Sequence, residues 1–84
     1  MDMRREQRLS PRRNTMIEAL IAFNGGRSME PCIIRNLSDG GAKVEVYRAV
    51  SVFPNSFDLI IPGQKPLACR LAWRALREMG LQFA

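Results

Sequence analysis

The stretch that decides the fold runs from residue 36 to residue 47 and reads NLSDGGAKVEVY. Its second half alternates apolar and polar side chains, a period of two that is typical of a strand with one buried face. The apolar set is Ala42, Val44 and Val46, which we expect to face a core. The run SDGG directly before it is a turn signal. A strand end, a tight turn and an alternating strand in succession predict an antiparallel β protein.

The rest of the chain extends this pattern. Asn24-Gly25-Gly26 supplies the positive φ angles of a tight hairpin turn, and Pro62-Gly63 ends a short strand. The expected strands are residues 16–23, 29–37, 42–47, 57–61, 67–75 and 80–83, with a loop at 48–56 and a turn at 77–79. Within the fifth strand, alternation places Cys69, Leu71 and Trp73 on one face. Six short strands without a convincing helix favour a closed antiparallel barrel or a small sandwich.

Length and charge divide the chain into two parts. Eighty-four residues make one domain with one small core, so any ligand is expected on the surface or at a rim. The net charge is +5, and 11 of the 13 basic residues are arginines. Five of these arginines fall within the first 13 residues, where Pro11 argues against a helix. We therefore expect a flexible, arginine-rich arm at residues 1–14 and a barrel at residues 15–84.

Composition argues against several classes of function. The chain has no histidine and only two cysteines, Cys32 and Cys69, which we expect to be reduced and buried in a cytoplasmic protein. No catalytic residue, metal ligand or cofactor is expected, because no metal-ligand cluster and no recognisable nucleophile–base pair is visible. No apolar run approaches the length of a membrane span. An enzyme is the poorest interpretation.

Two short motifs point to a nucleotide ligand. Arg8 and Arg12 form an Arg-x-x-x-Arg pair, which Arg4 and Arg8 overlap. An Arg side chain matches the O6/N7 edge of guanine and also binds phosphate. The second motif is the turn, where Asn36 and Ser38 offer polar groups among small residues. Taken alone, that turn equally fits an ordinary hairpin.

The order and spacing of these motifs resemble the PilZ domain family. The match consists of Arg8-Leu9-Ser10-Pro11-Arg12, then Asn36-Leu37-Ser38-Asp39-Gly40-Gly41, and finally the closing strands at residues 69–74 and 79–83. The resemblance implies a six-stranded barrel that binds cyclic di-GMP. By position, it assigns guanine and phosphate to Arg8 and Arg12, and the base to Asn36, Ser38 and Gly41. Asn36 departs from the Asp that many members carry.

Further candidates follow from the same resemblance. Arg4, Arg5 and Arg13 are additional basic candidates, and Trp73 either packs near the bound bases or is a core aromatic. The ligand is expected to order the arm and so to present a new face to a partner protein, whose identity stays open.

Two other binding functions are compatible with parts of the sequence. A nucleic-acid-binding barrel fits the basic charge but lacks an aromatic platform, because Phe23, Phe53, Phe57 and Phe83 are scattered along the sequence. A protein adaptor that binds no nucleotide is the other alternative. The paired motifs argue against it.

Overall fold

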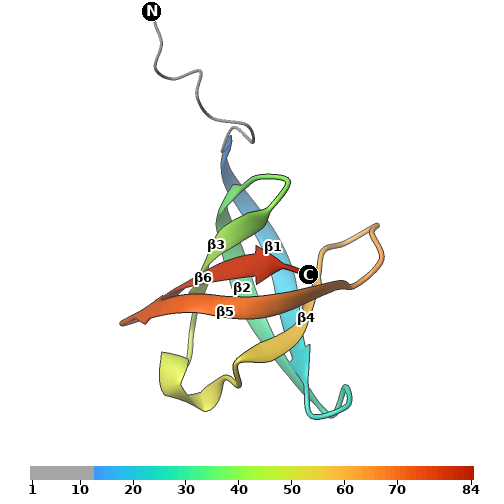
Figure 1. The fold of residues 1–84 in the computed structure, drawn as a ribbon, viewed down its shortest axis with the longest axis vertical. Coiled ribbons are helices and arrows are strands. Elements are labelled where there is room, and N and C mark those ends of the chain that lie inside the picture. Colours follow the sequence, from blue (N-terminus) through green and yellow to red (C-terminus); the bar gives the residue numbers. More distant parts are fainter. Residues whose placement is uncertain (1–12) are drawn as a thin grey trace, which may run out of the picture.

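The computed structural model describes residues 13–84, which form a closed six-stranded antiparallel barrel (Figure 1). The strands are β1 (Arg13–Phe23), β2 (Ser28–Leu37), β3 (Gly41–Val46), β4 (Ser56–Ile60), β5 (Leu67–Ala75) and β6 (Glu78–Phe83). Around the barrel they follow the order β1-β2-β3-β6-β5-β4, and β4 closes the sheet by pairing with β1. The only helical piece in this part of the chain is the 3-10 turn η2 (Val50–Val52). The predicted all-β barrel is confirmed.

Alternating side chains of all six strands fill the barrel. Val44 is fully buried and Ala42 and Val46 are nearly so, as their spacing predicts. Ile34 and Met79, the cross-strand partners of Val44, are also fully buried. Among the described residues, no polar or charged residue is buried, so the core of the barrel is apolar throughout.

Cys32 and Cys69 are free thiols within this core, as expected from the sequence. Burial raises the pKa of Cys32 to about 12, with a smaller contribution from the neighbouring Cys69. Burial likewise raises the pKa of Cys69 to about 11. Both thiols therefore stay protonated near neutral pH, which disfavours their reaction as nucleophiles.

The structure confirms the turn predicted for the first hairpin, but it places the turn of the last hairpin at other residues than predicted. Asn24, Gly25 and Gly26 have φ angles of 55°, 66° and 87°, so the expected Asn-Gly-Gly turn is confirmed. β1 begins at Arg13, two residues before the expected start of the barrel at residue 15. The turn expected at residues 77–79 is wrong. Leu76 and Arg77 form the turn, because Met79 is fully buried in the core and belongs to β6.

β5 changes face along its length. Cys69 is buried and Leu71 is partly buried, but the register with β6 shifts between Leu71 and Trp73. A bulge of this kind opposes two residues to one and turns the following side chain to the other face. Trp73 accordingly pairs with Gly80 and is 44% exposed on the outside of the barrel. The interpretation of Trp73 as a core aromatic is therefore wrong.

Three phenylalanines gather at one end of the core. The ring centroids of Phe23 and Phe53 are 5.8 Å apart, and those of Phe53 and Phe57 are 6.4 Å apart. Arg74 Nη2 donates a hydrogen bond to the Phe53 carbonyl at 2.8 Å and so holds the connecting loop in place. Phe53 and Phe57 are buried, so this cluster packs the core and offers no exposed platform for nucleic-acid bases.

Candidate ligand site beside the start of β1

The register of β1 and β2 brings the start of the barrel to the predicted turn. Arg13 pairs with Leu37 and Asn14 pairs with Asn36. The chain therefore enters β1 directly beside the segment that leads into residues 38–40. Of the predicted arginine sites, Arg4, Arg5, Arg8 and Arg12 lie outside the described residues, and Arg13 is described by its backbone alone.

Hydrogen bonds between backbone groups and the Ser38 side chain hold the turn. The Ser38 amide donates to the Gly41 carbonyl at 2.9 Å, and the Ser38 hydroxyl donates to the same oxygen at 3.3 Å. The Phe83 amide donates to the Gly40 carbonyl at 2.9 Å and ties the turn to β6. Since the hydroxyl proton of Ser38 is used internally, its oxygen is left as an acceptor. Ser38 thus has a structural role in addition to any contact with a ligand.

The two glycines of the turn differ in what surrounds them. A Cβ atom on Gly41 would lie 2.1 Å from the carbonyl oxygen of Leu81, so the close approach of β3 and β6 requires glycine there. A Cβ atom on Gly40 would meet nothing within 4 Å. Barrel closure therefore explains the glycine at position 41. Of the two glycines, Gly40 is the one whose backbone is open to a ligand.

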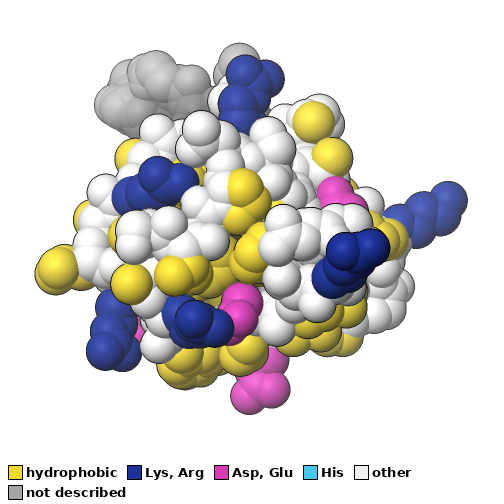
Figure 2. Space-filling view, turned by 90° about the horizontal axis from the view of Figure 1, so that it is seen from below, with side chains coloured by type: hydrophobic (Ala, Val, Ile, Leu, Met, Phe, Trp, Pro, Cys, Tyr) yellow, Lys and Arg dark blue, Asp and Glu magenta, His cyan; other side chains and the backbone are white. Residues whose placement is uncertain are grey.

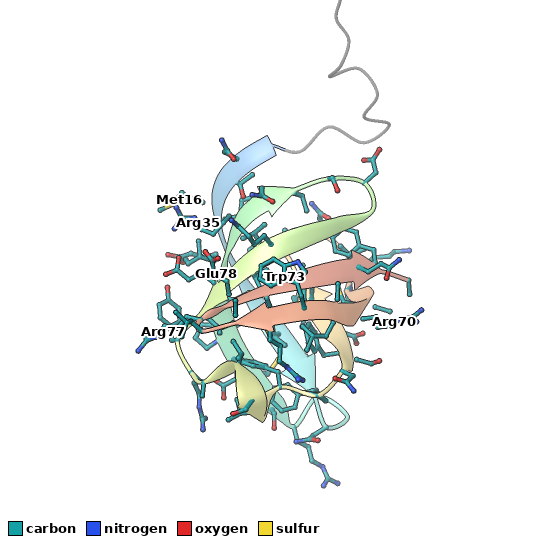
Figure 3. All side chains as sticks on the ribbon, turned by 60° about the vertical axis from the view of Figure 1, so that its left-hand side comes forward. Met16, Arg35, Arg70, Trp73, Arg77 and Glu78 are labelled. Carbon is teal, nitrogen blue, oxygen red and sulfur yellow. The ribbon has the colours of Figure 1, made fainter. Side chains whose placement is uncertain are left out.

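A shallow hollow opens on the outer wall next to Asn36. It is lined by Asn14, Thr15, Met16, Arg35, Asn36, Lys43, Glu45 and Glu78. Met16 is 73% exposed, and Figure 3 shows it on the same side of the molecule as Arg35 and Glu78. Thr15 donates a hydrogen bond to the carbonyl of Ile34, which fixes the irregular start of β1 against β2. The hollow is thus lined by both polar and apolar groups.

The charges that line this hollow balance one another. Arg35 Nη1 lies 2.9 Å from Glu45 Oε1, and both side chains are partly exposed. Lys43 and Glu78 add one further charge of each sign. A wall with two positive and two negative side chains has no net attraction for an anion, so a dianionic ligand needs basic groups from elsewhere in the chain.

A cross-strand row joins Asn36 to Trp73 across the outer wall. Asn36 pairs with Lys43, Lys43 with Gly80, and Gly80 with Trp73. Three steps between neighbouring strands span roughly 14 Å, at about 4.8 Å each. Trp73, which Figure 3 labels, stands on β5 at one end of this row, and Asn36 stands on β2 at the other end. The structure therefore brings two of the predicted site residues onto one wall.

Of the residues that line the hollow, the sequence singles out only Asn36 as a site residue. Alternation in β3 indicated that Lys43 and Glu45 face outward. Nothing local identified Arg35, Glu78 or Gly80 as their neighbours, because cross-strand pairing depends on register.

Other chemistry finds little support in the described part of the chain. No group of three His, Cys, Asp or Glu side chains within residues 13–84 could hold a metal ion. In the same range, no helix has the length and apolar character needed to cross a membrane. On the face in Figure 2, basic and acidic side chains are scattered among apolar ones rather than gathered into a basic groove.

The chain was compared with known proteins. No family model matches it, and no curated protein matches it either. The residues and their geometry therefore carry the functional argument.

Proposed function

We propose that this barrel is a receptor for cyclic di-GMP, which binds where the arginine-rich segment meets the turn at residues 36–41. The observation that carries the proposal is the pairing of Asn14 with Asn36. Arg12 directly precedes Arg13 in the sequence, and Arg13 is the first residue of β1. The Arg-x-x-x-Arg motif therefore leads directly into the backbone that faces the turn.

The balanced charge of the wall supports a division of roles. Arg35, Lys43, Glu45 and Glu78 offer no net attraction for two phosphates. Arg8 and Arg12 would supply that attraction, and their planar forks would also match the O6/N7 edge of guanine. Asn36 and the acceptor oxygen of Ser38 would face the base. Trp73, at the other end of the cross-strand row, would pack near the bound bases.

Signalling follows from the same arrangement. The two phosphates and two guanine edges of the ligand would draw several arginines toward the turn. Bringing like charges together is unfavourable without the ligand, so binding would order residues 4–13 and change the surface beside β1. A partner protein would then recognise this composite surface, in keeping with the resemblance to the PilZ family.

Calorimetric titration tests the proposal directly. Cyclic di-GMP should bind, and cyclic di-AMP should bind much more weakly, because adenine presents an amino donor where guanine presents an O6 acceptor. GTP and single-stranded DNA serve as comparisons. Equal binding of the two cyclic dinucleotides would contradict the role of the guanine edge. Binding of DNA alone would favour the nucleic-acid alternative, and no binding at all would favour the adaptor.

A further inference from the structure

Trp73 occupies the space that a side chain at position 80 would fill. A Cβ atom built on Gly80 would lie 2.1 Å from Trp73 Nε1, 2.4 Å from Cε2 and 2.6 Å from Cδ1. All three atoms belong to the five-membered ring of the indole, so that ring lies directly on the backbone of β6. An aromatic side chain that covers a cross-strand glycine in this way is held by contact with the bare backbone.

The seat on Gly80 leaves part of the Trp73 side chain exposed. Trp73 remains 44% exposed although its five-membered ring rests on β6. The bulge between Leu71 and Trp73 is what brings the side chain to the outside, where it shares a row with Lys43 and Asn36. The ring is therefore accessible while one of its edges rests against the backbone of β6.

We infer that Gly80 is a positioning residue of the ligand site: its missing side chain seats the indole of Trp73 as a fixed stacking surface for one guanine. This inference rests on the proposed function and names what orients one end of the site. A flat aromatic surface binds a base best when it is already oriented, since no conformational freedom is then lost on binding. Lys43, which pairs with Gly80, lies between this surface and Asn36 and is placed for a phosphate.

A methyl group at position 80 would displace the ring without removing it. Gly80→Ala should therefore shift the fluorescence emission of the free protein to longer wavelength and increase its quenching by acrylamide. Trp73 is the single tryptophan of the chain, so the signal has one source. In the Trp73→Ala background the same methyl group meets no indole, and circular dichroism should show both backgrounds folded.

Binding of cyclic di-GMP then separates positioning from general stability. Trp73→Ala should weaken binding by about 5- to 100-fold, the range expected for loss of one base–aromatic stack. Gly80→Ala should weaken it comparably, while the double variant should bind no worse than Trp73→Ala alone. Tyr47→Ala removes another exposed aromatic side chain and should leave affinity unchanged. Trp73→Ala introduces no crowding, so it tests the stacking surface even if Gly80→Ala fails to fold.

Two outcomes would overturn the inference in distinguishable ways. If the unaltered protein binds cyclic di-GMP but Gly80→Ala leaves affinity within twofold, or weakens it equally without Trp73, the inference is wrong and the proposed function stands. If the unaltered protein does not bind cyclic di-GMP at all, the proposed function fails and the inference fails with it.

Discussion

Asn14 and Asn36 are cross-strand partners at the point where β1 begins. This pairing places the start of β1 beside the end of β2, which leads into the turn at residues 38–40. Segments that are more than 20 residues apart in the sequence therefore lie side by side at this end of the barrel.

Arg12→Ala should weaken cyclic di-GMP binding by about 1.5–3 kcal/mol, the scale of a hydrogen bond to a charged group. Titration calorimetry measures the loss, and circular dichroism should show unchanged β structure. Arg27→Ala is the matched control, because Arg27 is exposed in the turn between β1 and β2 at the other end of both strands. An equal loss in the two variants would mean that only net charge matters.

Amide hydrogen exchange on residues 4–13 should slow when cyclic di-GMP binds, because the ligand neutralises and clamps arginines that otherwise repel one another. Heteronuclear relaxation on the same amides provides a second readout. The amides of β4 serve as an internal reference. Equal protection of residues 4–13 with and without ligand would show that signalling does not pass through the arm.

Glu78→Gln should strengthen cyclic di-GMP binding by about 1.5- to 5-fold, because it removes a negative charge from a wall that must accept a dianion. The gain should shrink in high salt, which screens exposed charges. Asp58→Asn removes an exposed carboxylate from β4 instead, and calorimetry at two salt concentrations should show little change. An equal gain from both variants would indicate a general charge effect.

Gly41→Ala should destabilise the barrel by about 1–3 kcal/mol, because the added methyl group would collide with the carbonyl oxygen of Leu81. Gly40→Ala has free space around its methyl group and should stay within about 0.5 kcal/mol of the unaltered protein. Urea unfolding curves measure both. Equal stability of the two variants would contradict the close approach of β3 and β6 at Gly41.

Alkaline pH should destabilise the fold through its two thiols. Burial raises the pKa of Cys32 to about 12 and that of Cys69 to about 11, so the unfolded chain loses thiol protons at lower pH than the folded one. Their contribution to stability is complete below about pH 9 and is lost as pH rises toward 11–12. Urea unfolding at pH 7, 9 and 10.5 should show that the free energy of unfolding falls more steeply with pH than in a Cys32→Ala/Cys69→Ala variant.

The two thiols of the folded protein should also resist alkylation by iodoacetamide at pH 8. Rapid alkylation would contradict their burial.

The local pattern of the sequence determined most of the strands. Residues 67–75 were predicted as a strand with the bounds that the structure shows, and the Asn-Gly-Gly turn was correctly located. The alternation of residues 42–46 correctly predicted which β3 side chains are buried. These features depend on two-residue periodicity and turn chemistry, which operate between neighbours in the chain.

Tertiary structure decided which residues share a wall. The bulge after Leu71 sends Trp73 outward, although strict alternation would place it in the core with Cys69. The row from Asn36 through Lys43 and Gly80 likewise exists only because four strands adopt one register. The sequence by itself determined the strands and named the candidate residues. Register and bulges are settled by the pairing of distant segments around one core, so only the folded barrel decided which candidates lie side by side.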